Sequence, residues 1–134
     1  MPTLVRGAVL ALACCALASC KEATGPSVPC LDDTGVALII ATSPEPRFSW
    51  TPACLAYRLG VSDSTGTIIW QIDADSGNTM RSGVTYGTIP AGSSETIPAG
   101  TLTAGQLYAV GLFRTASDTL PYEPSLLAAL AFRR

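Results

Sequence analysis

Phe48-Ser49-Trp50-Thr51-Pro52, followed by Leu55-Ala56-Tyr57-Arg58-Leu59-Gly60-Val61, is the stretch that decides the fold class of this chain. Side chains two residues apart share one face of a β-strand. Phe48 and Trp50 therefore share a face, and the second stretch keeps an apolar period of two from Leu55 to Val61. We predict a strand in each stretch, with one face turned toward an apolar core.

Strands of the same kind extend in both directions from this stretch. The apolar run 36–40 ends at Ser43-Pro44-Glu45-Pro46, because proline cannot donate a hydrogen bond to a β-ladder. After a turn at 62–66, Ile68, Trp70 and Ile72 are expected on one face of a second strand, which makes a β-hairpin. Further strands are predicted at 84–89, near 95–97 and at 106–114.

The last segment, 125–132, is ambiguous in the sequence. Its leucines and alanines favour a helix by intrinsic propensity, whereas its place at the end of a β-rich chain favours a strand. We choose the strand, because sheet pairing can override a weak propensity. About seven short strands then predict an all-β fold, a two-sheet β-sandwich.

Parts of this pattern resemble the immunoglobulin-like sandwich of fibronectin type III domains. The stretch 48–59 resembles the second and third strands of that family, and Leu102-Thr103-Ala104-Gly105-Gln106-Leu107-Tyr108-Ala109-Val110 resembles its leucine-to-tyrosine corner. The resemblance implies that Trp50 packs in the core and that the Tyr108 hydroxyl turns back to the chain before it. The segment 73–100 is longer than the family's usual connection, and the family's Arg-Gly-Asp tripeptide is absent. The resemblance therefore implies a fold and a habit of binding, but no functional residue.

The first twenty residues carry a targeting signal. Arg6 precedes the apolar run 7–18, which is too short for a bilayer span of ~20 residues but suits a secretory signal. The run ends in Leu17-Ala18-Ser19-Cys20, which resembles the lipobox of bacterial lipoproteins. That resemblance implies cleavage before Cys20, acylation of Cys20 and lipid anchoring in the cell envelope. The alternatives are an ordinary signal peptide with an incidental Cys20, and an uncleaved transmembrane anchor.

The chain is thus expected to consist of three parts: a signal peptide at 1–19, a lipidated cysteine with a tether at 20–35, and the sandwich at 36–134. Lys21 follows the cysteine. In lipoproteins of enteric-type bacteria, a residue other than aspartate at this position usually permits passage to the outer membrane. The resemblance therefore favours the outer membrane if the host is Gram-negative.

Cys30 and Cys54 are the cysteines that remain once the signal peptide and Cys20 are set aside. An even pair in an oxidising compartment predicts a disulfide, and a closed loop of about 25 residues would contribute ~3 kcal/mol of stability. Two free buried thiols are the alternative. A zinc site is poorly supported, because the chain has 0 histidines and two cysteines cannot complete the usual ligand set.

Catalytic groups are not recognisable in the sequence. The lack of histidine excludes Ser-His and Cys-His nucleophile pairs, so we predict no enzyme, no cofactor and no metal site. Asp73-Ala74-Asp75-Ser76-Gly77-Asn78 resembles the opening of a calcium loop, but Val84 falls where a closing glutamate is needed. A turn is the favoured interpretation of that stretch. A net charge of -2 without a basic stretch argues against nucleic acid as a partner.

Three functions compete. We favour a non-catalytic envelope module for a protein partner over a carbohydrate- or other ligand-binding sandwich, and over an enzyme. Exposed aromatic side chains on a sheet face would indicate carbohydrate, an apolar patch or open sheet edge would indicate protein, and a pocket of carboxylates would indicate an enzyme. Trp70 is either an exposed platform or, as its alternation favours, a core residue. The long polar segments 73–83 and 90–105 are either binding loops or tolerated insertions.

The lipobox generates the first prediction. Processing between Ser19 and Cys20 should leave an acylated Cys20 at the amino terminus of the membrane-extracted protein. Mass spectrometry of the amino-terminal peptide measures this directly. A mature chain that begins elsewhere, or an unmodified Cys20, would contradict the prediction.

Overall fold

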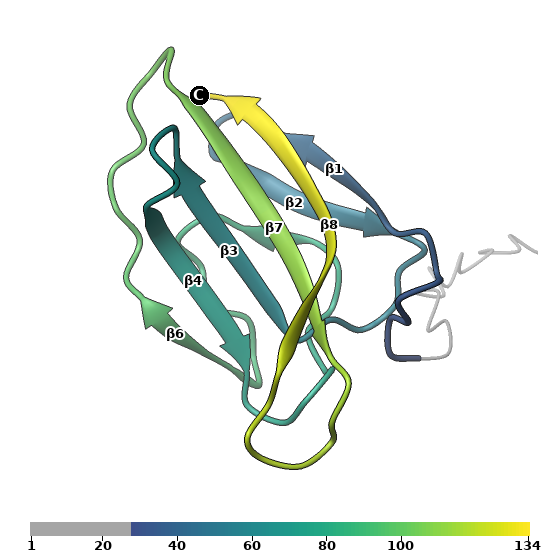
Figure 1. The fold of residues 1–134 in the computed structure, drawn as a ribbon. Coiled ribbons are helices and arrows are strands. Elements are labelled where there is room, and N and C mark those ends of the chain that lie inside the picture. Colours follow the sequence, from purple (N-terminus) through teal and green to yellow (C-terminus); the bar gives the residue numbers. More distant parts are fainter. Residues whose placement is uncertain (1–27) are drawn as a thin grey trace, which may run out of the picture.

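The computed structural model describes residues 28–134, which form two antiparallel sheets packed face to face (Figure 1). The smaller sheet has the order β1-β2-β5, with β1 at Ala37–Ala41, β2 at Arg47–Thr51 and β5 at Val84–Thr85. The larger sheet has the order β6-β4-β3-β7-β8, with β3 at Arg58–Asp63, β4 at Ile68–Ala74, β6 at Ser93–Ile97, β7 at Leu107–Thr115 and β8 at Pro124–Arg133. The predicted all-β sandwich is confirmed, with eight strands rather than about seven.

The predicted signal peptide at 1–19, the lipidation site Cys20 and the tether up to residue 27 lie outside the described residues. No helix among residues 28–134 is long and apolar enough to cross a membrane. Residues 28–35, which were assigned to the tether, contact the sandwich: Pro29 forms a parallel bridge with Leu55, and Cys30 has no exposed surface.

The core lies between the two sheets and is built from the inward side chains of both. Phe48 from β2 contacts Trp70 from β4 and Phe132 from β8, with ring centroids 6.4 and 5.6 Å apart. The aliphatic members come from the middle of the larger sheet and are fully buried: Leu59, Val61, Ile72, Val110 and Leu112. The alternation from which the strands were predicted is therefore the alternation that fills the core.

Trp50 and Tyr108 lie where the resemblance implied. Trp50 is 2% exposed, and its indole Nε1 donates a hydrogen bond of 2.8 Å to the carbonyl oxygen of Cys54. Tyr108 is 5% exposed, and its hydroxyl accepts the backbone N–H of Thr103 at 2.8 Å. Each aromatic ring is buried while its polar atom is paired, so neither leaves an unsatisfied group in the core.

The prediction for Ile68 was wrong. Ile68 is 45% exposed, whereas Trp70 and Ile72 have no exposed surface. The register between β3 and β4 shifts at this point: Val61 lies opposite Trp70, but Ser62 lies opposite Ile68. A β-bulge inserts one extra residue and so reverses the face on which the residues beyond it point. Ile68 therefore lies on the outer face of the sheet.

The ambiguous last segment is a strand. β8 pairs with β7 along its whole length, from Leu107 opposite Arg133 to Thr115 opposite Pro124.

The two long polar segments, 73–83 and 90–105, contain buried residues and a strand. The first contains Met80 and Asn78, which are 2% and 8% exposed, and the second contributes β6 to the edge of the larger sheet.

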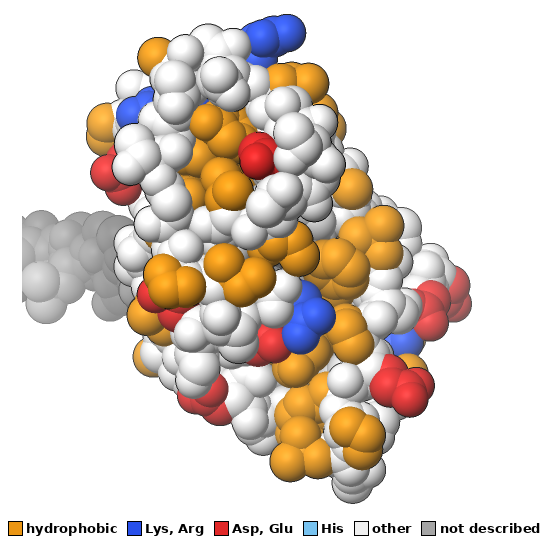
Figure 2. Space-filling view, turned by 60° about the vertical axis from the view of Figure 1, so that its left-hand side comes forward, with side chains coloured by type: hydrophobic (Ala, Val, Ile, Leu, Met, Phe, Trp, Pro, Cys, Tyr) orange, Lys and Arg blue, Asp and Glu red, His pale blue; other side chains and the backbone are white. Residues whose placement is uncertain are grey.

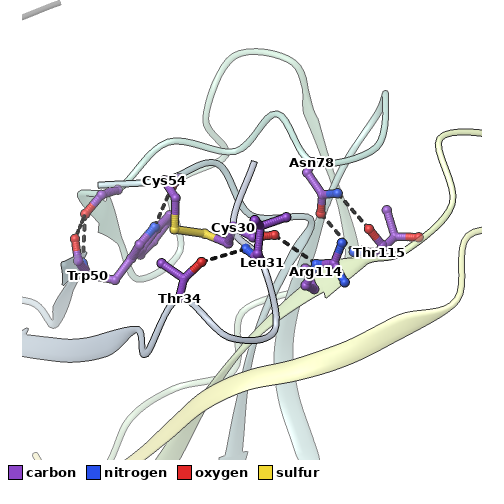
Figure 3. The surroundings of a disulfide bond; sticks show 9 residues. Cys30, Leu31, Thr34, Trp50, Cys54, Asn78, Arg114 and Thr115 are labelled. Carbon is purple, nitrogen blue, oxygen red and sulfur yellow. Dashed lines mark hydrogen bonds between the residues drawn. A yellow bond between two sulfur atoms is a disulfide. The ribbon is translucent and has the colours of Figure 1, made fainter. Parts of the chain in front are cut away.

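A disulfide joins Cys30 to Cys54, the pair expected from the sequence (Figure 3). The guanidinium of Arg114 on β7 donates to the carbonyl oxygen of Cys30 at 2.8 Å. Nearby, the Asn78 side chain donates to the backbone oxygen of Thr115 at 2.7 Å and accepts its N–H at 2.8 Å. The disulfide and the Arg114 hydrogen bond hold the amino-terminal segment against the sandwich, and the Asn78 hydrogen bonds join the segment 73–83 to β7.

Trp50 provides the test of this packing. Trp50→Ala should lower the free energy of unfolding by ~3–5 kcal/mol, because it removes a large buried ring and leaves a cavity. Urea unfolding followed by circular dichroism measures the change. Thr51→Ala is the matched control, since Thr51 is the next residue on β2 and is exposed; it should change stability by less than ~0.5 kcal/mol. Equal stability of the two variants would show that the core has been misplaced.

A candidate binding groove and open edge on the larger sheet

A row of small residues crosses the outer face of the larger sheet. Gly60 on β3 lies opposite Gln71 on β4 and opposite Gly111 on β7, and Gly111 lies opposite Ala129 on β8. Strand neighbours in register point to the same face. Three of the four positions in this row therefore carry a methyl group or no side chain at all, which leaves the sheet hollow along a line perpendicular to its strands.

Larger side chains flank the row and turn it into a groove of about 260 Å³. Ser62, Ala109 and the displaced Ile68 line one wall. Phe113 and Leu126, which lie opposite each other, line the other wall together with Arg58. In Figure 2 the outer face of this sheet is turned to the right, and hydrophobic side chains form a band there that a small group of basic and acidic side chains interrupts.

The polar end of the groove is a fixed network around Asp73. Arg58 binds Asp73 through two hydrogen bonds of 2.7 Å, from Nε to Oδ1 and from Nη2 to Oδ2. Gln71 and the Tyr57 hydroxyl donate to the same carboxylate at 3.3 Å. The bond to Asp73 raises the pKa of Arg58, and burial, followed by the charge of Asp73, raises the pKa of Tyr57 above its ordinary value. A bidentate pair of this kind orients the guanidinium beside the groove.

The two glycines of the floor differ in what a side chain would meet. A Cβ at Gly111 would lie 2.9 Å from the Phe113 ring, so this ring leans over Gly111. A Cβ at Gly60 would meet only the backbone oxygen of Trp70, at 3.9 Å. Gly60 therefore marks the part of the floor where a Cβ atom could be introduced without a clash.

One end of the row reaches an open sheet edge. β8 is the last strand of the larger sheet, and among residues 28–134 it pairs only with β7. Of its ten residues only the last, Arg133, is charged, and Leu126 and Leu130 are 57% and 41% exposed. The opposite edge strand, β6, is five residues long and carries Glu95. Natural sheets usually protect long edges with charges, proline or bulges. In β8 the proline and the charge lie at the two ends, at Pro124 and Arg133, and the stretch from Ala128 to Phe132 carries none of these features, so it is a candidate pairing site.

The site residues singled out in the sequence do not come together in this groove. Cys30, Cys54, Trp50 and Tyr108 are buried structural residues. Trp70 is also in the core, with no exposed surface, and its Nε1 donates to the Glu95 carboxylate at 2.9 Å. The alternative of an exposed aromatic platform at Trp70 is therefore wrong.

The stretch that resembled a calcium loop is engaged in other contacts. Asp73 is bound by Arg58, Asp75 accepts a hydrogen bond of 2.6 Å from Ser94, and Asn78 is bonded to Thr115. Among the described residues, no three Asp, Glu, Cys or His side chains are grouped as metal ligands. The stretch acts as a connection that is tied into the sandwich.

The groove could not be predicted from the sequence, because its floor is formed only when four strands pair in this register. The alternation of Gly60 with Leu59 and Val61 was visible, as was the place of Gly111 between Val110 and Leu112. Only the pairing of Gly60 with Gly111 places the two positions that lack a side chain next to each other. Comparisons with protein-family models, with curated proteins and with solved structures found no match to this chain.

Proposed function

We propose that this chain is a non-catalytic, lipid-anchored module of the bacterial cell envelope, which binds a protein partner across the outer face of its larger sheet. The observation that carries the proposal is the apolar groove over Gly60 and Gly111, which ends at the edge strand β8. An apolar hollow that runs across a sheet face fits a segment of a protein partner, because burial of apolar surface supplies affinity and the side-chain hollows supply specificity.

A protein partner fits this surface better than a carbohydrate. Sugar rings are commonly held against exposed aromatic faces. Phe113, the aromatic residue that lines the groove, is half-buried and leans over Gly111, and none of the exposed large hydrophobic residues in the described part of the chain is aromatic. They are all aliphatic: Val28, Leu31, Ile39, Ile68, Ile89, Leu107, Leu120, Leu126 and Leu130. Carbohydrate or another ligand remains the second candidate function.

A small-molecule or catalytic role has less support. At about 260 Å³ the groove is smaller than typical ligand pockets of ~300–1,000 Å³. Arg58 is the only charged residue of its lining, and the nearby Asp73 is already bound by Arg58 and Gln71. An extended occupant that lies across the strands would use the hollow without needing an enclosed pocket.

The proposal also includes the membrane anchor and the likeness to fibronectin type III domains. The lipobox ending in Cys20 supports anchoring in the cell envelope, and Lys21 favours the outer membrane in a Gram-negative host. The buried Trp50 and the hydrogen bond from the Thr103 N–H to the Tyr108 hydroxyl support the likeness to fibronectin type III domains.

Filling the groove is the direct test. Gly60→Val should retain the fold, since a Cβ at Gly60 meets no atom closer than 3.9 Å and valine favours strands. The introduced isopropyl group should block the groove and lower the yield of partner crosslinked in native membranes about tenfold, equivalent to ~1.4 kcal/mol of lost binding. Quantitative mass spectrometry of the crosslinked protein measures the yield.

Ser49→Val is the matched control. Ser49 is partly exposed on the central strand of the smaller sheet, and it alternates with the buried Phe48 and Trp50. This variant places the same side chain on the other outer face and should leave the yield unchanged. If Gly60→Val and Ser49→Val capture the same partners at the same yield while both remain folded, binding does not use the groove.

A further inference from the structure

The groove is open at the edge of the sheet. Its floor runs from Gln71 through Gly60 and Gly111 to Ala129, and Ala129 lies on β8, beyond which no described residue continues the sheet. A strand added to β8 would therefore extend the wall and the floor of the groove.

We propose that the occupant of this edge is a second copy of the same chain, which pairs antiparallel through β8 with Ala129 opposite Ala129 of the second copy. This inference rests on the proposed function, because it completes the same groove. In this arrangement the row of small residues continues without interruption from one copy into the other. The two larger sheets become one, and each copy contributes half of the binding surface.

The charged residues that flank β8, Glu123 and Arg134, favour this register, and the Arg134 guanidinium also donates to the carbonyl oxygen of Thr42 at 3.3 Å. β8 contains a bulge at Leu127, because Leu112 lies opposite Ala128 whereas Phe113 lies opposite Leu126. If Leu127 is left out of the count, Glu123 precedes Ala129 by the same number of residues as Arg134 follows it. Self-pairing about Ala129 therefore places Glu123 of each copy opposite Arg134 of the other. Opposite charges that meet across strands favour a register, and like charges oppose it.

The face of β8 also suits a second copy. The side chains that would meet beside the two-fold axis on the outer face are Ala129, Ala131 and Leu126, which are exposed and uncharged. Alanine at the axis lets two strands approach to the ordinary spacing of a sheet. A lipid anchor would confine both copies to one membrane, and such confinement raises the effective concentration of weakly pairing partners.

A cysteine at the axis tests the register in native membranes. Residues directly opposite in antiparallel strands have Cα atoms about 4.5–5.5 Å apart, within the about 4.4–6.8 Å that a disulfide spans. Full-length Ala129→Cys should therefore form a covalent dimer when diamide is added as oxidant. Ala131→Cys is the matched control, because it is exposed on the same face of the same strand. In the proposed register two copies of residue 131 lie about 13 Å apart, so this variant should remain monomeric on a reducing-agent-free gel.

Exchanging the charges at residues 123 and 134 distinguishes specific strand pairing from random collision of two copies. In the Ala129→Cys background, Glu123→Arg should slow dimer formation severalfold, and the further change Arg134→Glu should restore it. Equal crosslinking at 129 and 131, no dimer above the wild-type level, or a crosslink to a different protein would each overturn self-pairing. The proposed function is read separately from the Gly60→Val variant: loss of partner capture there, without dimers at residue 129, would retain the function and reject the dimer. Dimers at residue 129 together with unchanged partner capture by Gly60→Val would retain the dimer and reject the proposed function.

Discussion

The antiparallel pairing of β3 with β7 is the constraint on which the rest of the structure depends. This pairing places Leu59 opposite Leu112 on the inner face, where both are fully buried against the smaller sheet. The same register places Gly60 opposite Gly111 on the outer face. Because side chains alternate across a strand, one pair of strands makes both the middle of the core and the floor of the groove. A register slip of one residue would lose both at once.

The disulfide region fixes the amino-terminal side of the sandwich. The carbonyl oxygen of Cys54 accepts the indole of Trp50 on the smaller sheet, and the carbonyl oxygen of Cys30 accepts the guanidinium of Arg114 on the larger sheet (Figure 3). Asp32 forms an ion pair of 2.9 Å with the same arginine. The described segment that begins at residue 28 is therefore held to both sheets.

Most of the fold could be predicted from the sequence, because it follows from local alternation. Alternation correctly predicted the strands of Phe48, Trp50 and Tyr108, and the cysteine count correctly predicted the disulfide. Ile68 could not be placed, since the bulge beside Ser62 depends on how two strands pair rather than on either strand alone. The candidate site was missed for the same reason: the gap at Gly60 becomes a groove only beside the gap at Gly111.

The proposed binding surface, which is the outer face of the larger sheet with its β8 edge, can be followed by hydrogen exchange. Backbone amides of a free edge exchange with solvent, whereas amides that are hydrogen-bonded to a partner are protected. Exchange measured by mass spectrometry should be slower at 124–133 in native membranes than in dilute purified protein, with 37–51 unchanged. Equal exchange at 124–133 in the two preparations, or protection confined to 37–51, would contradict the account.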